Sequence, residues 1–280
     1  MSSIPVNFDK AQSFLIDTTK CTGCRGCQVA CKQWNQLKAE DTRFFSGEGY
    51  QNPPLMSEYT FTRVKFKDYQ KDGQNEFAFY KEMCMHCNEP ACASVCPVGA
   101  FVKTAEGPVV YDAKRCIGCR FCMIACPFGV PKYEWDKAVP GVRKCIMCAP
   151  RVAQGKPTAC AEICPTGATK FGDRDELLKE AHKRIQDNPG TYLSHIYGET
   201  EVGGTSVMLL SSVDFGKFGY REDLTQRALP MYTYQVLSRI PDFVPIFGVL
   251  LGGVYWITHR REEVAEAESH EKPADKGGAQ

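Results

Sequence analysis

Several signatures of catalysis are missing from this sequence of 280 residues. It has no glycine-rich phosphate loop, no nucleophile elbow and no HExxH run, so the common hydrolase and phosphoryl-transfer motifs are absent. The formal net charge is only +1, which argues against a nucleic-acid partner. The first residues, MSSIPVNFDKAQS, lack the regions of a signal peptide. With no sign of a substrate site, we expect a chain that is not itself an enzyme.

Cysteine is abundant instead, with sixteen residues arranged in four sets of four and none left over. The first and third sets read C-x₂-C-x₂-C-x₃-C, which is the bacterial ferredoxin run for a [4Fe–4S] cube. The second set reads C-x₂-C-x₄-C-x₃-C, and the fourth reads C-x₂-C, an eleven-residue loop and C-x₃-C. In order, the sets are Cys21, Cys24, Cys27 and Cys31; Cys84, Cys87, Cys92 and Cys96; Cys116, Cys119, Cys122 and Cys126; and Cys145, Cys148, Cys160 and Cys164.

These spacings suit a cube of iron and sulfur. A short loop reaches several corners of a cube only if its cysteines are close together, and two-residue gaps provide this. Glycine in the loop lets backbone N–H groups approach the sulfurs, and proline after the last cysteine directs the chain away from the site. At four thiolates per cube, the sixteen cysteines predict four [4Fe–4S] clusters and no other metal site.

Two other uses of cysteine compete with this prediction. Paired C-x₂-C units also bind structural zinc, but a run of three such cysteines is an odd way to supply a tetrahedral site. An even number of cysteines also suits disulfides, but a chain of 280 residues with 43% hydrophobic content needs no such framework to fold. Both uses are therefore disfavoured relative to iron and sulfur.

The order of the short strands predicts which sets lie together. Between the second and third sets, residues 100–104 and 109–112 are predicted as strands around a turn at 106–108, which completes a ferredoxin-like hairpin. The first set has a strand before it, at 13–17, and the fourth set has a strand after it. Each of these halves lacks what the other has, so we expect the first and fourth sets to pair in space.

In two-cluster ferredoxins the fourth cysteine of each run ligates the other cube. Applied to this chain, the exchange predicts four ligand quartets, here named A to D, with the assignment firmer for C and D. Quartet A is Cys21, Cys24, Cys27 and Cys164; quartet B is Cys31, Cys145, Cys148 and Cys160; quartet C is Cys84, Cys87, Cys92 and Cys126; and quartet D is Cys96, Cys116, Cys119 and Cys122.

The expected fold class is α+β, with two ferredoxin-like modules of two [4Fe–4S] clusters each and small β-hairpin insertions, followed by one C-terminal transmembrane helix. Turn and capping signals predict hairpin strands over 59–69 and 76–81 around Asp72-Gly73, a helix over 174–187 with Asp173 and Glu176 as a capping box, and a buried strand over 205–212. The predicted domains are 1–36 with 143–172 as the outer module, 37–83 as the hairpin insertion, 84–142 as the inner module, 173–238 as a cover that binds partners, 239–260 as the transmembrane helix and 261–280 as a disordered cytoplasmic tail.

Residues 243–258 contain no charged side chain, and a three-residue extension toward the N-terminus adds only Asp242. Nineteen helical residues span roughly 28 Å, which is close to the thickness of the hydrocarbon core of a bilayer. Tyr255 and Trp256 lie near one end, as in an aromatic belt. We therefore expect a transmembrane helix. The alternative is a buried core helix or a surface anchor, since Pro245 and three glycines weaken an isolated helix.

Basic residues after this helix outnumber those before it. His259, Arg260 and Arg261 follow the helix, whereas Arg239 before it is offset by Asp242. The positive-inside rule then predicts an inner-membrane protein with a cytoplasmic C-terminus and periplasmic cluster modules. This orientation conflicts with the missing signal peptide. Either the modules face the cytoplasm, or the folded chain is exported with a partner that carries the signal.

Longer motifs surround the sets: CTGCRGCQVACKQWN (21–35), CMHCNEPACASVCPVGA (84–100), CIGCRFCMIACPFGVPKY (116–133), CIMC and CAEICPTGATKFG within 145–172, and GGTSVM (203–208). With them, nearly the whole chain resembles the iron–sulfur (beta) subunits of molybdopterin-dependent oxidoreductases, most of all those of membrane-bound formate dehydrogenase. Nitrate reductase relatives replace one cysteine by tryptophan, and this chain does not. The missing signal disfavours the hydrogenase-partner branch, although residues 195–199 are reminiscent of it.

The resemblance implies electron transfer rather than catalysis. In this family a molybdenum or tungsten alpha subunit oxidises formate, the beta subunit passes the electrons on, and a membrane cytochrome b gamma subunit delivers them to quinone. Such beta subunits are exported with an alpha subunit that bears a twin-arginine signal, which would resolve the conflict in orientation. The alternatives are the same role beside a hydrogenase or another molybdopterin reductase, and a stand-alone membrane-tethered polyferredoxin.

Several residues beside the ligands have a predicted role and a plainer alternative. His86 is expected to support the ligands by hydrogen bonding rather than to gate transfer or ligate iron, because each cube already has four thiolates. Trp34 and Met85 are expected to pack. Positive charge beside a cube should favour its reduced state, unless it is solvated or paired with a partner. The residues concerned are Lys20, Arg25, Arg115, Arg120 and Lys144.

Overall fold

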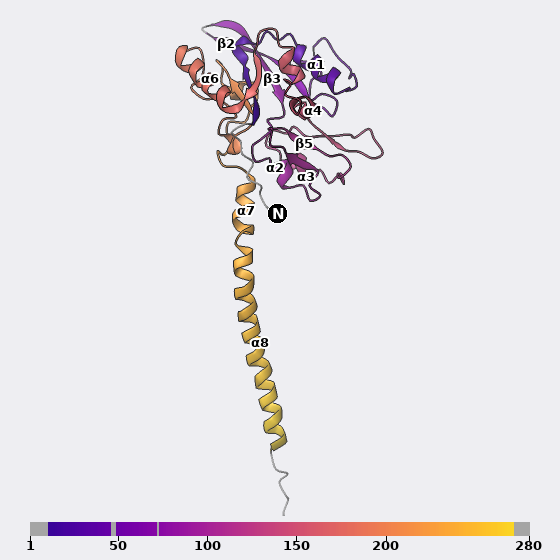
Figure 1. Ribbon diagram of the computed structural model, residues 1–280, viewed down its shortest axis with the longest axis vertical. Coiled ribbons are helices and arrows are strands. Elements are labelled where there is room, and N and C mark those ends of the chain that lie inside the picture. Colours follow the sequence, from indigo (N-terminus) through magenta and orange to yellow (C-terminus); the bar gives the residue numbers. More distant parts are fainter. Residues whose placement is uncertain (1–10, 46–48, 72, 272–280) are drawn as a thin grey trace, which may run out of the picture. The chain divides into compact units, whose positions relative to one another are not determined.

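The computed structural model describes residues 11–45, 49–71 and 73–271 (Figure 1). By its internal contacts the chain divides into two compact units, Met1–Pro230 and Met231–Gln280. Three predictions fall wholly or partly outside the described residues. They are the signal-free N-terminus up to residue 10, Asp72 in the hairpin turn, and the tail from residue 272.

A three-stranded sheet brings distant parts of the first unit together. Its central strand β1 (Gln12–Asp17) pairs antiparallel with β8 (Thr169–Asp173) and parallel with β9 (Val207–Leu210). The apolar residues 14–16 of β1 are at most 2% exposed, so both faces of this strand are buried. Because β1 precedes the first cysteine set and β8 follows the fourth, their pairing joins these two sets, as the strand order predicted.

Two predicted hairpins are present in the first unit, together with one that was not predicted. The long hairpin of β2 and β3 is buried near its base and exposed toward its turn. The hairpin of β4 and β5 joins the second and third sets. The hairpin of β6 and β7 was not predicted, because two-residue strands carry no periodic signal. These strands are β2 (Thr62–Lys71), β3 (Gln74–Met83), β4 (Phe101–Lys103), β5 (Val109–Tyr111), β6 (Lys132–Tyr133) and β7 (Val142–Arg143).

The longest helix of the first unit, α6, begins at its predicted cap. Oδ1 of Asp173 accepts hydrogen bonds from the N–H groups of Asp175 and Glu176. The buried face of α6, with Leu177 and Ala181, packs on the sheet. The helices of this unit are α1 (Gly26–Trp34), α2 (Ala91–Ser94), α3 (Phe121–Ala125), α4 (Ala149–Val152), α5 (Ala159–Glu162) and α6 (Arg174–Asp187), with 3₁₀ helices η2 (Thr18–Lys20), η3 (Glu201–Gly203) and η4 (Phe215–Phe218).

The hydrophobic core is built around cysteines. The largest cluster of buried apolar side chains includes Cys31, Cys84, Cys145 and Cys160, which come from three different sets. A smaller cluster contains Cys122 and the hairpin of β4 and β5. The fold therefore positions the sulfurs inside the same apolar interior that stabilises it.

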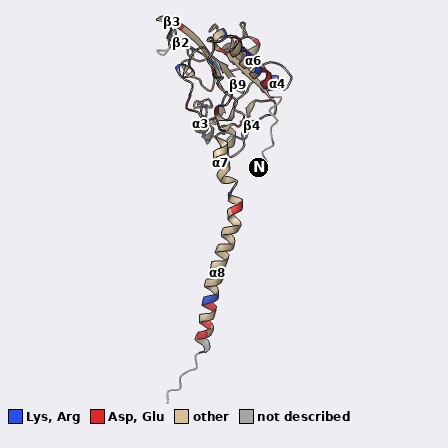
Figure 2. Cartoon of the chain, turned by 90° about the vertical axis from the view of Figure 1, so that its left-hand side faces the viewer, with Lys and Arg blue, Asp and Glu red and all other residues tan. Residues whose placement is uncertain are grey.

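The described residues of the second unit are mostly helical and begin with a long apolar stretch. This unit contains α8 (Ile240–Glu271), and α7 (Pro230–Leu237) precedes it. Within Pro230–Ser269 an 18-residue window has a mean hydropathy of 1.6, so the segment is long and apolar enough to cross a membrane. In Figure 2, α8 has a red band near its start and then no further charge until a blue band. In the sequence, the charged residues that bound this stretch are Asp242 and Arg260.

The predicted tail from residue 261 is wrong for residues 261–271, which continue α8. Alanine, glutamate and arginine in this stretch are strong helix formers. Glu263 also lies 3.4 Å from Arg260 and 3.6 Å from His259, at the i,i+3 and i,i+4 spacings that support a helix. Low hydrophobicity thus marked the end of the apolar segment and not the end of the helix.

We expect Gly198→Ala to destabilise the first unit. Gly198 has a φ of 95°, and a Cβ there would lie 2.1 Å from the carbonyl oxygen of Val207 on β9. Strain and a backbone clash that no rotamer relieves should cost on the order of 2 kcal/mol or more. Thermal unfolding of the cluster-loaded protein measures this. Gly172→Ala on β8 is the control, since its Cβ meets nothing within 4 Å. Equal midpoints for the two variants would contradict the expectation.

Candidate metal centres

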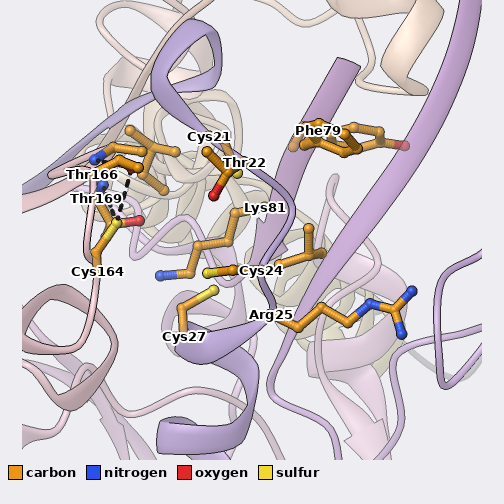
Figure 3. A pocket seen from close by; sticks show the side chains of 14 residues that line it. Cys21, Thr22, Cys24, Arg25, Cys27, Phe79, Lys81, Cys164, Thr166 and Thr169 are labelled. Carbon is orange, nitrogen blue, oxygen red and sulfur yellow. Dashed lines mark hydrogen bonds between the residues drawn. The ribbon is translucent and has the colours of Figure 1, made fainter. Parts of the chain in front are cut away.

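Quartet A lines a cavity. The side chains of Cys21, Cys24, Cys27 and Cys164 surround it, together with apolar residues of β1 and β2. Figure 3 shows these four cysteines around one space, with Lys81 extending among them. The pairing of β1 with β8 is what carries Cys164 across to the first set.

Quartet D lines a second cavity, in the inner half of the first unit. Cys96, Cys116, Cys119 and Cys122 face it, and Phe101 is among the apolar side chains that close it. The loops that supply these cysteines are held by the hairpin of β4 and β5 and by the contact of α2 with α3. Each of these two cavities therefore has one complete predicted quartet in its wall.

Electrostatic interactions among the thiols indicate that the cysteines assigned to each of the other two quartets lie near one another. Burial raises the pKa of Cys87 well above its usual value, and the other three members of quartet C raise it further. Burial likewise raises the pKa of Cys31 to about 12, and Cys160 and Cys148 of quartet B add to the rise. The pKa of Cys145, also raised by burial, responds to Cys31 and Cys160. The structure thus brings together the members of all four predicted quartets.

Hydrogen-bond donors point at several of these sulfurs. Backbone N–H groups reach cysteines of quartets A, B and D, and a side-chain amide reaches a second sulfur of quartet B. Such donors stabilise negative charge on a ligand sulfur and tune the potential of a bound cluster. They are Thr169 N to Cys164 at 3.4 Å, Met147 N to Cys145 at 3.3 Å, Ala100 N to Cys96 at 3.2 Å, Gly118 N to Cys116 at 3.4 Å and Asn35 Nδ2 to Cys31 at 3.6 Å.

The residue before the second cysteine of every set has a left-handed backbone. The φ values are 67° at Gly23, 47° at His86, 71° at Gly118 and 55° at Met147. This conformation turns the loop so that both cysteines of a C-x-x-C face the same space, and glycine adopts it without strain. His86 and Met147 hold it while 1% exposed, fixed by the surrounding core. Glycine at two of the four positions is a sequence signal for this conformation, whereas His86 and Met147 give none.

His86 is hydrogen-bonded, as predicted. Its Nδ1 accepts a hydrogen bond of 2.9 Å from the N–H of Val109, so the neutral ring carries its proton on Nε2. Burial, followed by the charges of Lys144 and Lys103, holds the pKa of His86 well below its usual value. The ring is therefore neutral. Among the described residues, its buried Nε2 has no hydrogen-bond partner.

Of the five cations predicted beside ligands, only Lys144 is buried. Its Nζ donates to the carbonyl oxygens of Cys145, at 2.9 Å, and Val109. Arg25 and Arg120 instead stack on Phe66 and on Trp135, so the surface alternative describes them better. Lys20 and Arg115 are exposed.

Met85, at 3% exposure, packs in the core as expected. Trp34 is 42% exposed and lies 5.0 Å beneath the guanidinium of Arg151, so its packing is only partial. Two further cations near the thiols, the buried Lys81 and the half-buried Lys103, were not predicted. No cysteine adjoins either of them in sequence, so no local signal marked them.

The GGTSVM segment, residues 203–208, holds the second set in place. The carbonyl oxygen of Gly204 accepts from the N–H of Asn88 at 3.0 Å, and the N–H of Ser206 donates to the carbonyl oxygen of His86 at 3.3 Å. Lys103 links the same two partners, since its Nζ lies 2.9 Å from that oxygen and 2.8 Å from Ser206 Oγ. A motif far from any cysteine in sequence therefore supports the loop of quartet C.

The donor sets fit [4Fe–4S] clusters. Each quartet supplies four thiols, two quartets enclose a cavity, and N–H donors reach the sulfurs. Within the described part of the chain, no group of three or more His, Cys, Asp or Glu side chains was found that could hold a single metal ion. The sixteen cysteines support four [4Fe–4S] clusters. These features define an iron–sulfur electron-transfer protein.

Comparison with known proteins agrees with this class. Residues 75–174 and 20–100 each match a 4Fe-4S dicluster domain family. A protein of Nitratidesulfovibrio vulgaris is 44% identical over 258 residues, which are 92% of this chain and 69% of the relative. The iron–sulfur subunit of the nitrate-inducible formate dehydrogenase of Escherichia coli K12 is 38% identical over 69% of this chain and 66% of its own length.

Two further relatives span the same region. The formate dehydrogenase-O iron–sulfur subunit of Escherichia coli K12 is 36% identical over 72% of this chain and 67% of the relative. Hydrogenase-2 operon protein HybA of Escherichia coli O157:H7 is 35% identical over 72% and 70%. This chain belongs to the family of iron–sulfur subunits that contains them, with two 4Fe–4S dicluster domains and one long apolar C-terminal helix.

We expect Gly23→Ala to reduce cluster occupancy while Gly26→Ala, in the same loop, does not. At Gly23, φ is 67° and a Cβ would lie 2.8 Å from the ring of Phe79. Gly26 starts α1, and its Cβ would meet nothing closer than the Cys24 sulfur at 3.6 Å, so alanine fits there. Iron and acid-labile sulfide per purified chain measure the occupancy. Unchanged iron in Gly23→Ala would show that the left-handed position is dispensable.

Proposed function

We propose that this chain is the non-catalytic electron-transfer (beta) subunit of a formate dehydrogenase. In this proposal it relays electrons from a molybdopterin catalytic subunit, with molybdenum or tungsten, to a membrane cytochrome b and its quinone site. The quartets A to D are the ligand sets, as named above. The observation that carries the proposal is the unbroken succession of quartets between two exposed ends of the first unit.

Interactions between neighbouring thiols support one linear order. Burial raises the pKa of Cys27 of quartet A to about 11, and Cys160 of quartet B is among the thiolates that add to it. Cys145 of quartet B responds in the same way to Cys84 of quartet C. Cys92 of quartet C, with a pKa that burial raises to about 12, responds to Cys122 of quartet D. The order is therefore A, B, C, D.

The two ends of this order are also the exposed ends. Among the sixteen cysteines, Cys24 of quartet A and Cys119 of quartet D are exposed, whereas every other one is buried or half-buried. Apolar side chains accompany Cys119 at the surface, with Ile117 65% exposed and Phe121 55% exposed. Electron transfer requires close approach of donor and acceptor, so exposed terminal ligands suit docking of one partner at each end.

The residues of this chain determine what the relay can do. When bound, [4Fe–4S] clusters accept and release single electrons. The cysteines hold them, the apolar core excludes water from quartets B and C, and the N–H donors to sulfur favour the more negative state. No proton-transfer residue is needed for this task.

The membrane part of the proposal has separate support. The apolar helix α8 ends in a basic stretch, His259 to Arg261, before its acidic continuation. By the positive-inside rule, we propose a single-pass inner-membrane anchor with the C-terminus in the cytoplasm and the cluster modules in the periplasm.

A second candidate is the same relay beside a hydrogenase or another molybdopterin reductase, which the similarity to HybA favours. The test is purification of the detergent-solubilised complex through a tag on this chain, followed by identification of its subunits and a formate-dependent dye-reduction assay. A molybdopterin subunit with formate activity supports the proposal. A nickel–iron partner without formate activity supports the second candidate. A chain that purifies alone would leave a stand-alone polyferredoxin.

Replacement of one terminal ligand tests the relay directly. We expect Cys119→Ala to abolish formate-dependent quinone reduction while formate-dependent reduction of an artificial dye stays within a few fold of wild type. The reason is that quartet D loses an exposed ligand, while the donor side of the complex is untouched. The neighbouring exposed variant Ile124→Ala is the control for surface disturbance. Equal loss of both activities would indicate a failure of assembly instead.

The proposed orientation predicts the behaviour of a reporter. The reporter is a fluorescent protein that matures only in the cytoplasm, fused after Gln280. It should be bright, because by the positive-inside rule the basic residues Arg260 and Arg261 keep the segment that follows them in the cytoplasm. Alkaline phosphatase at the same position, which needs the periplasm, should be inactive. The opposite pair of results would reverse the orientation.

A further inference from the structure

Lys81 is a buried cation that is associated in space with a different group of cysteines from the set nearest to it in sequence. It belongs to β3, in the hairpin between the first two sets, and is 3% exposed. Cys84 follows Lys81 by three residues, yet the side chain of Lys81 extends toward quartet A. In Figure 3 the side chain of Lys81 extends into the space between Cys164 and Cys27.

No carboxylate balances this charge within the described part of the chain. Lys81 forms no salt bridge there, and no oxygen or nitrogen atom accepts a hydrogen bond from its Nζ. Its aromatic neighbour is Phe14 of β1, with Nζ 5.1 Å from the ring centroid. The buried Arg63 on the adjacent strand, by contrast, pairs with Glu82. An ammonium buried without an anion is strongly unfavourable, so a charge of opposite sign must be close to Lys81.

Thiols from two quartets face this ammonium. Its electrostatic partners are Cys27 of quartet A and Cys160 and Cys145 of quartet B, and Cys160 is also within hydrogen-bonding reach of the ammonium. Cysteines of both quartets in turn have Lys81 as an electrostatic partner. Those cysteines are Cys21 and Cys27 of quartet A, and Cys31 and Cys148 of quartet B.

We propose that Lys81 is a positive charge shared by the sites of quartets A and B, which makes both sites easier to reduce. A cube with four thiolates carries net negative charge, and one added electron makes it more negative. A buried ammonium stabilises that added electron, and the low dielectric of the core strengthens the effect. Because Lys81 faces both quartets, it raises both potentials together and keeps the step between them close to balanced.

This role rests on the cluster sites of the proposed function but not on the identity of the partner. It also distinguishes the effect of a buried charge from that of a charge that merely adjoins a ligand in sequence. Lys20 directly precedes Cys21 and carries the same charge, but it is exposed to solvent. Water and salt screen an exposed charge, so Lys20 should contribute little to the same potentials.

The test is a redox titration of the purified complex followed by electron paramagnetic resonance. In Lys81→Met, we expect two of the four cluster signals to become harder to reduce. The reduction equilibrium should fall about tenfold for each, which is about 59 mV for a one-electron couple. Lys81→Arg, which keeps the charge, should bring both potentials most of the way back to their wild-type values. Lys20→Met should change both reduction equilibria by less than threefold.

Iron content, measured on the same samples, distinguishes a shifted potential from a lost cluster. Lys81→Gln, which keeps a polar side chain without charge, provides a second neutral variant if methionine lowers occupancy. Full iron with unchanged potentials in a neutral variant would overturn the proposal, and so would an equal shift in Lys20→Met. Wild-type protein without signals for all four sites would instead refute the cluster assignment, whatever Lys81 does.

Discussion

Charge buried in an apolar interior is the constraint on which this structure depends. Sulfurs of quartets B and C lie within the hydrophobic core, where an isolated thiolate is strongly disfavoured and burial raises the pKa of the thiols. The chain also buries Lys81 and Lys144 and half-buries Lys103, and none of the three forms a salt bridge with a carboxylate in the described residues. Buried thiolates and buried ammonium groups are each unfavourable alone, but they stabilise one another when a cluster is bound. Folding and cluster binding therefore depend on each other.

The backbone meets this constraint with two repeated devices. In every set, a left-handed residue before the second cysteine turns both sulfurs inward, whether it is glycine or the buried His86. After three of the four sets, the sequence C-P-x-G places a further left-handed glycine, at Gly99, Gly129 and Gly167. The chain thereby folds back on the last cysteine, and N–H groups beyond the glycine donate to its sulfur, as Ala100 does to Cys96. Loop geometry therefore supplies the ligands and part of their electrostatic environment together.

Local sequence predicted what local geometry controls. Cysteine spacing predicted the four sets, strand and turn signals predicted the hairpin of β4 and β5, and the capping box predicted the start of α6 at Asp173. The pairing of β1 with β8 was also predictable, because each half-module lacked a strand that the other possessed. The parallel addition of β9 and the contacts of residues 203–208 with the second set were not, since both join segments that are far apart in the chain. Lys81 was missed for the same reason: it lies beside the second set in sequence and serves the first and fourth in space.

The proposed exchange of the fourth cysteine has a consequence for the succession of sites. The first and fourth sets each contribute to quartets A and B, and the second and third each contribute to C and D, so shared loops tie the sites together within each pair. No loop is shared between B and C. There, Cys145 and Cys84 are joined by packing and hydrogen bonds, in which Val109 donates its N–H to His86 and accepts from the ammonium of Lys144. In the proposed order, the step from B to C is thus the one that side-chain packing maintains, so the buried, strained His86 and the residues 203–208 that hold it matter at this junction.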